Sequence, residues 1–562
     1  MHDDTASFSA WRSLVEKDLR GASFEKALVA ESPEGLALAP LYADAPCDPG
    51  LPGAAPFTRG PSESPAPVAL CVRVEPPASR APGSLDDDLA GGADALWIDA
   101  RDPEALRAAR EKGLALVVEC DGRAAREVLR EAGSSLRVLA LDPMHAAARA
   151  TLPLDALGAA LRELGALAQE HPGTLLARVS TLAVHEAGGD AADELAYALS
   201  TAAAYLRAMT DAGVSVTDAA AALTAQVAVG RDTFGELCKL RALRVCWHKL
   251  LAAAGAPDAP LRGLHAVCSS RTLSQRDPWV NMLRVTTEVF SALVGGAELV
   301  TPLPFDEALS ARSPLGRRLA RNTLLVLREE SHLGRVIDPA GGAYYVEHRT
   351  DALAREAWSR FTALERAGGV QKSLGDKSLR AHLDASWARR ETLLARRREA
   401  VLGVSEFANV GETLPAAVSP APSTAEGALP AHRDAEGFEA LRAAVESLGA
   451  RDVLLLTLGP ASEHRARLGF AQNFFAVAGV KARSADAVSR ADVACLCGDD
   501  ARYADEAAGA ARALREAGCE RVVLAGRPGA LEAALREAGV RDFIYLGCEV
   551  LATLRAIFGV NS

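Results

Sequence analysis

The chain has 562 residues, of which 49% are hydrophobic and 24% charged, and its formal net charge at pH 7 is −11. This length favours several domains, and the acidic balance disfavours wholesale binding of nucleic acid. No stretch approaches the roughly 20 apolar residues of a membrane-spanning helix, and the N-terminus lacks the apolar core of a signal peptide, so we expect a cytoplasmic protein without membrane contact. The ten cysteines include no CxxC pair, which predicts free thiols.

Residues 1–62 are predicted to form an arm rather than a domain. A short helix fits Trp11–Leu19. The prolines that follow it exclude long regular structure: Pro33, Pro40, Pro46, Pro49, Pro52, Pro56 and Pro61. The arm also carries large apolar side chains, such as Phe24, Tyr42 and Phe57. We expect them to pack on the chain itself or on a partner protein.

Residues 63–402 alternate between short apolar runs and alanine-rich helical patterns. The runs are Val68–Val74, Ala95–Asp99, Leu114–Glu119, Val138–Leu141, Leu175–Val179, Leu264–Cys268, Glu298–Val300 and Tyr344–Val346. Buried strands that alternate with helices predict a parallel sheet covered by helices, and about eight such units favour a (β/α)8 TIM barrel. A series of doubly wound domains is the structural alternative.

Two helices near the end of this region are notable. The pattern between Arg317 and Glu330 predicts a helix, followed by a glycine- and proline-marked turn and the short strand Tyr344–Val346. A second helix over 376–400 is very basic, with Arg389, Arg390, Arg396, Arg397 and Arg398. We interpret its arginines as a solvated face, with binding of an anionic partner or ligand as the alternative.

The remaining chain predicts a linker and a second domain. Residues 403–436 include a proline-rich stretch with little to bury, which is typical of a linker. Residues 437–562 hold five strand-like runs: Asp452–Leu458, Val480–Arg483, Val493–Cys497, Arg521–Ala525 and Asp542–Leu546. Parallel strands alternating with helices over this length favour a flavodoxin-like, Rossmann-type doubly wound sheet.

Four stretches carry a family resemblance. They are LPGAAPFTRGP (51–61), FGELCKLRALRVCWHKL (234–250), NTLLVLREESHLGRVIDPAGGAYYVE (322–347) and GVSEF (403–407). They resemble signatures of the acyl-CoA mutases that use adenosylcobalamin, above all methylmalonyl-CoA mutase, which interconverts methylmalonyl-CoA and succinyl-CoA by radical migration. The resemblance implies a TIM barrel followed by a cobalamin-binding-like domain.

The turn that would hold the cofactor departs from the family pattern. The family places Asp-x-His-x-x-Gly after the first strand of the second domain, where the His is the axial cobalt ligand and the Asp tunes it. Here His464 matches the ligand, but Ser462 stands in the Asp position and Arg467 in the Gly position. We therefore expect a degenerate turn without cofactor-binding residues.

The barrel departs from the family pattern as well. Ala183 stands where catalytic chains carry a His, and His185 lies at a different offset. Thr301 stands in the place of a second His, and residues 62–72 contain no aromatic residue where a catalytic Tyr is expected. His265 lies in a region that contacts CoA in catalytic chains, but its surroundings favour a structural role.

These departures together resemble the small (β) subunit of the heterodimeric enzyme. The resemblance then implies no catalytic residue in this chain, a catalytic large (α) subunit as partner, and adenosylcobalamin and acyl-CoA on that partner. Two alternatives stay open. The chain is a divergent mutase that uses His464, or it is a binding subunit that senses acyl-CoA.

Overall fold

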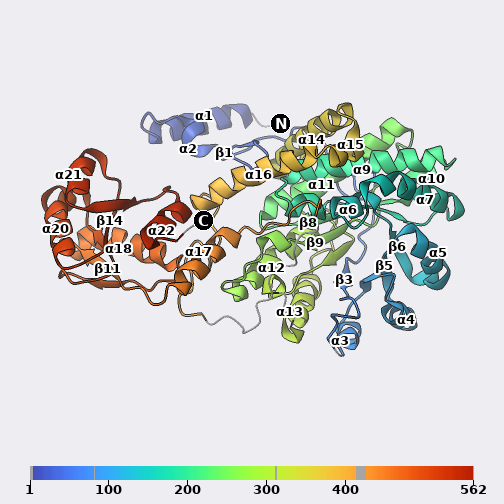
Figure 1. Cartoon of the computed structure of the whole chain (residues 1–562). Helices are drawn as coiled ribbons and strands as arrows, with labels where there is room; N and C mark the ends of the chain where they lie inside the picture. Colours follow the sequence, from blue (N-terminus) through green and yellow to red (C-terminus); the bar gives the residue numbers. More distant parts are fainter. Residues whose placement is uncertain (1–3, 82, 310–312, 413–425, 561–562) are drawn as a thin grey trace.

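The computed structural model describes residues 4–81, 83–309, 313–412 and 426–560. It contains two α/β bodies, a barrel on the right of Figure 1 and a smaller parallel sheet on the left, with a helical arm above them. The fold class predicted from the sequence, with an arm, a TIM barrel and a flavodoxin-like domain, is confirmed. The domain boundaries stay predictions, and residues 413–425 of the predicted linker lie outside the described residues.

The barrel has eight parallel strands in the order β6-β5-β4-β3-β10-β9-β8-β7. The strands are β3 Ala69–Arg73, β4 Ala95–Asp99, β5 Ala115–Glu119, β6 Leu136–Ala140, β7 Ala177–Ser180, β8 Leu223–Val229, β9 His265–Cys268 and β10 Leu299–Thr301. The ring closes between β6 and β7, where Leu139 N donates to Leu175 O at 2.8 Å and Leu141 bridges to Ala177.

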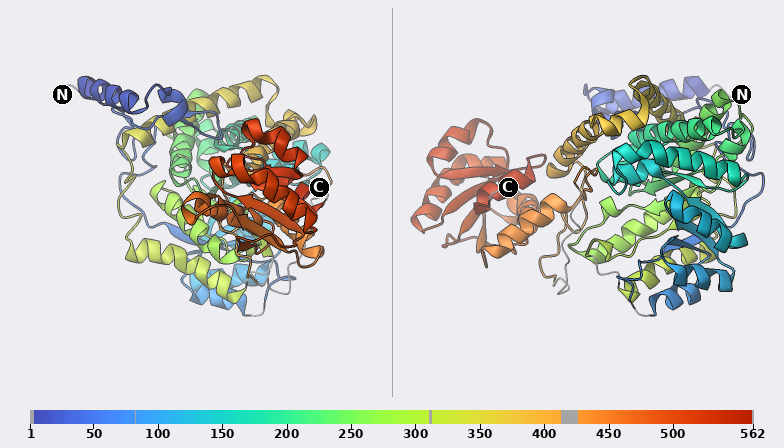
Figure 2. Two further views of the ribbon diagram at one scale, coloured as in Figure 1. Left: turned by 90° about the vertical axis from the view of Figure 1, so that its left-hand side faces the viewer. Right: turned by 45° about the vertical axis from the view of Figure 1, so that its right-hand side comes forward.

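Helices surround this ring (Figures 1 and 2). They are α3 Ser84–Ala90, α4 Pro103–Lys112, α5 Gly122–Glu131, α6 Pro143–Ala148, α7 Leu157–Glu170, α8 Leu182–Glu186, α9 Ala191–Asp211, α10 Val216–Ala222, α11 Thr233–Ala254, α12 Asn281–Val294, α13 Pro314–Leu325, α14 Tyr344–Arg366, α15 Gly369–Gly375 and α16 Ser378–Ala395. Helix α13 continues into a π-helical turn over Val326–Glu330, which confirms the helix predicted there.

In the barrel, one predicted strand is wrong and one strand was missed. The run Tyr344–Val346 begins α14 instead of forming a strand, because its β-favouring side chains are overridden by packing against α9 and α11. The missed strand is β8, all seven of whose residues are buried. Thr224 and Gln226 do alternate with apolar residues, but this short period-2 pattern directly continues the alanine-rich helix α10, so it was not predicted as a strand.

Side chains fill the axis of the barrel. The inward-facing positions form a cluster of their own: Cys71, Ala95, Trp97, Val117, Val138, Ala140, Val267 and Leu299. Trp97 is only 5% exposed, and its ring meets the His265 ring edge-on at a centroid distance of 5.4 Å. The inside of the barrel is therefore packed with side chains.

The second body is a five-stranded parallel sheet in the order β12-β11-β13-β14-β15. Its strands are β11 Val453–Thr457, β12 Arg483–Ala485, β13 Val493–Cys497, β14 Arg521–Ala525 and β15 Val540–Ile544. Its longer helices are α17 Glu436–Ser447, α18 Ala461–Ala476, α20 Ala508–Glu516 and α22 Val550–Phe558. In chain order the sheet reads 2-1-3-4-5, the flavodoxin order, whose ligand crevice lies between the first and third strands.

The arm lies at the edge of the molecule. It begins with α1 Asp4–Asp18 and α2 Phe24–Leu28, and Figure 2 shows α1 projecting away from the barrel. Trp11 packs edge-on against Phe24 at 6.1 Å, while Leu14 is 64% exposed. The arm helix predicted from the sequence is thus confirmed, and part of its apolar surface stays open. No helix in the described part of the chain is long and apolar enough to cross a membrane.

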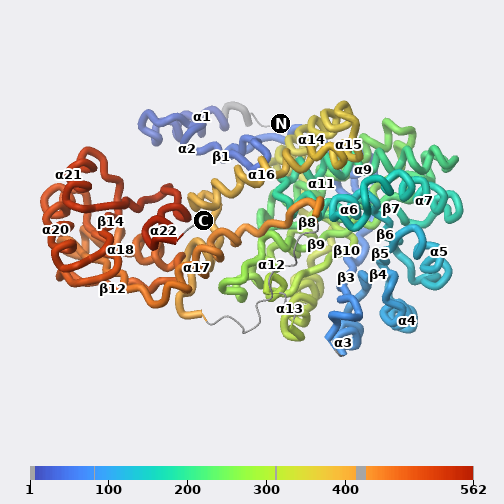
Figure 3. The backbone as a smooth tube through the Cα atoms, in the orientation of Figure 1, coloured from blue at the N-terminus to red at the C-terminus, as the bar shows by residue number. Residues whose placement is uncertain are grey.

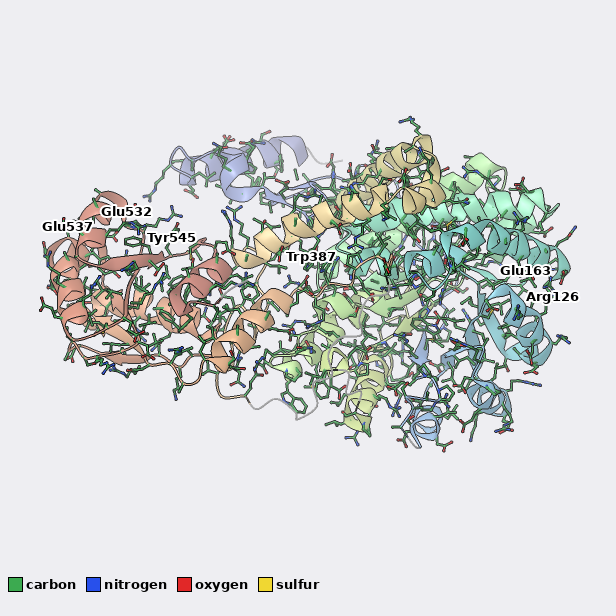
Figure 4. All side chains as sticks on the ribbon, in the orientation of Figure 1. Arg126, Glu163, Trp387, Glu532, Glu537 and Tyr545 are labelled. Atoms are coloured by element: carbon green, nitrogen blue, oxygen red, sulfur yellow. The ribbon has the colours of Figure 1, made fainter. Side chains whose placement is uncertain are left out.

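A segment before α17, the strap (residues 427–435), crosses the carboxyl end of the barrel (Figure 3). Its backbone N–H groups donate to three loops that follow barrel strands: Leu429 to Ala148 O at 2.8 Å, His432 to Glu186 O at 2.8 Å, and Asp434 to Arg271 O at 2.9 Å. Trp387, labelled in Figure 4, stacks on the His432 ring at 4.4 Å. The strap therefore ties α16 to the mouth of the barrel.

The basic helix α16 and the residues after it present only part of their arginines to solvent. Arg389, Arg396 and Arg398 are exposed, as predicted. Arg390 instead donates to both carboxylate oxygens of Asp434 at 2.7 Å, and Arg397 lies over the rings of Phe470 and Phe474. For these two, the prediction of a solvated face is wrong because they join separate segments of the fold. All ten cysteines are free, as predicted.

Candidate functional site

The expected cofactor turn follows β11 in the second body. Gly459, with φ +73°, makes the turn, and α18 begins two residues later at Ala461. Ser462, His464 and Arg467 therefore lie on the first turns of a helix. Ser462 is exposed, and the Nδ1 atom of His464 is 3.0 Å from Gly459 O, so this contact orients the imidazole toward its own turn.

Two side chains of this chain cover the carboxyl edge of the sheet beside this turn. Arg467 donates to Gly498 O at 2.8 Å, and its guanidinium lies 4.7 Å from the centre of the Tyr503 ring. The Tyr503 hydroxyl accepts from Gly498 N at 3.0 Å and donates to Ala525 O at 2.7 Å. Together they bridge the ends of β13 and β14.

The same two side chains crowd the neighbouring backbone. A Cβ atom on Gly526 would lie 3.1 Å from the Tyr503 ring and 3.2 Å from the Arg467 guanidinium. A corrin tail needs backbone at this edge to be open for close approach. With Arg467 and Tyr503 over this edge, the residues present do not fit adenosylcobalamin there.

At the carboxyl end of the barrel, His185 takes part in a buried network. Its Nε2 atom is 2.6 Å from Ser269 Oγ, and its Nδ1 atom is 2.9 Å from Glu194 Oε1. These contacts match the order nucleophile, base and acid of a Ser-His-Glu triad. Ser269, however, is only 1% exposed, and Lys239 Nζ binds the same Glu194 oxygen at 3.0 Å.

This network lacks the accessibility that acyl transfer needs. Burial lowers the pKa of His185 to about 4, with a further contribution from Arg271. The imidazole is thus neutral at pH 7, and the Ser269 hydroxyl lies in the buried interior. Ala183, at the expected catalytic His position, is fully buried in the barrel core.

His265 and Thr301 are part of the hydrogen bonding inside the barrel. His265 Nε2 lies 2.8 Å from Thr301 Oγ1, which donates to Cys71 O at 2.8 Å. His265 Nδ1 lies 3.1 Å from the side-chain amide of Gln226. Burial lowers the pKa of His265 to about 3, so the ring is neutral. Both residues hold strands together at the level of Trp97.

Two cavities lie at the carboxyl ends of the barrel strands, where TIM barrels place their sites. One of about 500 Å³ lies over the loops after β7, β8 and β9, beneath Ser32–Glu34 of the arm. The other, of about 470 Å³, lies over the ends of β4, β5 and β6. Neither lining includes Trp97 or His265, so both cavities stop short of the barrel axis.

Three of the resembling sequence stretches meet in one buried ion-pair cluster, which we call the motif hub: Arg59, Arg241, Asp338 and Glu347. Arg241 donates to Glu347 at 2.6 Å and to both oxygens of Asp338. Arg59 of the arm donates to the same Asp338 at 3.1 Å. These three stretches thus hold the arm, α11 and the turn before α14 together. Their presence in the chain is explained by this structural role and requires no catalytic role.

Comparison with known proteins agrees with these motifs. A family model described as methylmalonyl-CoA mutase matches residues 149–466. The methylmalonyl-CoA mutase small subunit of Streptomyces virginiae is 40% identical and the alignment covers 98% of this chain and 96% of that protein. The small subunit of Propionibacterium freudenreichii subsp. shermanii is 33% identical, with 97% and 92% covered.

A protein named simply methylmalonyl-CoA mutase, from Cereibacter sphaeroides, is 34% identical, but only 41% of this chain and 33% of that protein align. Similarity over almost the full length is thus found with proteins named small subunit. Together with the barrel, the parallel sheet and the shared motifs, these matches show that the chain belongs to the methylmalonyl-CoA mutase family.

Proposed function

We propose that this chain is the non-catalytic small (β) subunit of a heterodimeric, adenosylcobalamin-dependent methylmalonyl-CoA mutase. A catalytic large (α) subunit holds the cofactor and the acyl-CoA, and this chain stabilises it. The observation that carries the proposal is the carboxyl edge of the sheet at β13 and β14, which Arg467 and Tyr503 cover.

The barrel supports the same proposal. An acyl-CoA bound along the barrel axis would have to displace Trp97 and the chain of hydrogen bonds through His265 and Thr301. These groups lie in the tightly packed interior, where displacement is costly. The projecting α1, with Leu14 exposed, is a surface that the arm offers to a partner subunit.

The test is to purify the chain alone and together with a large subunit that carries an intact Asp-x-His-x-x-Gly turn. We expect the chain alone to show no cobalamin absorbance and no interconversion of methylmalonyl-CoA and succinyl-CoA, and the pair to co-purify and be active. Stoichiometric cobalamin on the isolated chain would overturn the proposal.

A second candidate is a divergent catalytic mutase with His464 as ligand. It is favoured by the placement of this imidazole, whose Nε2 atom has no hydrogen-bond partner among the described residues. On this reading, His464→Ala abolishes cobalamin binding and activity in the reconstituted complex. We expect instead that His464→Ala leaves both unchanged, and the spectrum of the complex measures this directly.

A further inference from the structure

A cavity of about 160 Å³ lies at the amino-terminal end of the barrel, where the arm joins it. It is bounded by residues 59–68, which lead from the arm into β3, and by the starts of β6 and β10. The polar side chains in its lining are Arg59, Ser62, Ser64, Arg137, Arg244, Glu298 and Asp338. The site is thus separate from the carboxyl end of the barrel and from the crevice of the second body.

Arg244 is the unusual member of this lining. It is only 3% exposed, and its Nη2 atom donates to Gly295 O at 2.7 Å and to Gly296 O at 2.6 Å. Among the described residues, no carboxylate lies within ion-pairing distance of it. Burial lowers its pKa to about 10, which still leaves the guanidinium charged at pH 7. A buried cation without a directly paired carboxylate is costly, and Asp338 and Glu298, which raise the pKa of Arg244, act from beyond ion-pairing distance.

The carboxylates nearby are already engaged. Asp338 pairs with Arg59 and Arg241, Glu347 with Arg241, and Glu298 with Arg137. Glu298 also accepts from Gly263 N at 2.6 Å. Four guanidinium groups therefore face three carboxylates, and the one positive charge left over is that of Arg244, which lines the cavity.

We propose that this cavity binds a tetrahedral oxyanion, either free phosphate or the terminal phosphate of a phosphomonoester. Arg244 supplies the charge from within, and Arg137 and Arg59 supply guanidinium groups at the rim. Arginine forks match phosphate oxygens geometrically and form strong charge-assisted hydrogen bonds. A volume of 160 Å³ is below the roughly 300–1,000 Å³ of whole-ligand pockets, so it encloses one such group.

Bound there, the anion would also connect the arm to the barrel, because residues 59–68 form one wall. The inference does not depend on the mutase assignment. It is tested on the full-length chain by calorimetry in phosphate-free buffer, with sodium phosphate, AMP and adenosine at constant ionic strength. We expect one phosphate per chain and no heat from adenosine.

The titration with AMP identifies the source of the anion. Binding of AMP with an affinity similar to that of phosphate means that a phosphomonoester can present its end group while the nucleoside stays outside. Binding of phosphate without AMP points to the free ion. No binding of either ligand, or equal heat from sodium chloride, overturns the proposal.

Variants connect the binding to the residues. Arg244→Met is expected to weaken phosphate binding at least about tenfold, the effect of losing a charge-assisted hydrogen bond. Because the Arg244 side chain is buried, Arg137→Met serves as a milder second variant. The Arg137 side chain is 41% exposed, and we expect its replacement to weaken phosphate binding about threefold. Arg207→Met, at a 63% exposed arginine that pairs with Glu365, is the matched control. Wild-type affinity in folded Arg244→Met and Arg137→Met would exclude the site.

Discussion

Replacing Arg241 by methionine is expected to lower the free energy of unfolding of the barrel by about 3–5 kcal/mol. Arg241 is the only cation near Glu347 within ion-pairing distance among the described residues, and the main partner of Asp338. The side chains of Asp338 and Glu347 are 5% and 2% exposed. Their charges would remain in the interior with too little compensation.

The measurement can isolate the barrel region. All six tryptophans lie at or before Trp387, which packs in a hydrophobic cluster shared with the second body, so their fluorescence follows mainly the unfolding of the arm and barrel. Urea titrations of the variant should show an early fluorescence transition. The second body should keep its own transition in far-UV circular dichroism, because its contacts do not involve the motif hub.

Two further variants separate the effect of charge from that of packing. Arg207→Met removes an exposed ion pair and should cost less than about 1 kcal/mol. Adding Asp338→Asn and Glu347→Gln to Arg241→Met removes the unpaired charges and should recover part of the loss. If Arg241→Met alone were as stable as Arg207→Met, or if the triple variant were no more stable than Arg241→Met, the role of the motif hub would be contradicted.

The barrel was predictable because each unit repeats a short apolar run followed by a helix. Ala95–Asp99 is a strand with the predicted bounds. The strand β8 was missed although Thr224 and Gln226 alternate with apolar residues, since this short pattern directly continues an alanine-rich helix. The strand predicted at Tyr344–Val346 was wrong for a different reason. Its side chains favour a strand locally, but the packing of a 23-residue helix outweighs this preference.

The site was predictable only where one short segment carries the pattern. Ser462, His464 and Arg467 lie within six residues, so the loss of the cofactor turn was visible in the sequence. The covering of the sheet edge at β13 and β14 was not, because Tyr503 comes from another helix and meets Arg467 only in the folded chain. The pair Arg59–Asp338, separated by 279 positions, shows the same limit for the motif hub.

Glutamate 288 should make the barrel lose stability as the pH rises, and Glu288→Gln should remove most of that dependence. Glu288 lies in α12, is fully buried and has no cation within ion-pairing distance among the described residues. Its oxygens accept from Thr272 Oγ1 at 2.6 Å and from Ser269 N at 3.2 Å. Burial is the main cause that raises its pKa to about 8, and the charge of Glu236 adds to it.

The sign follows from the proton that the folded state retains. Between the unfolded pKa of about 4.5 and the folded pKa of about 8, the folded chain binds a proton that the unfolded chain has released, so stability falls as the pH rises. The full loss is on the order of 3–5 kcal/mol. Glutamine is neutral at every pH and can still accept from Thr272, although its amide cannot accept from Ser269 N.

We therefore expect wild type to be slightly more stable than Glu288→Gln at pH 5, by about 1 kcal/mol for the lost hydrogen bond, and clearly less stable at pH 8.5. Urea titrations followed by tryptophan fluorescence at both pH values measure the difference. Glu391→Gln, at an exposed glutamate on α16, should keep the wild-type dependence. If the difference in stability between wild type and Glu288→Gln were the same at both pH values, Glu288 would not carry the proton, and the loss of stability would have to arise from other groups of the buried network, such as Glu236.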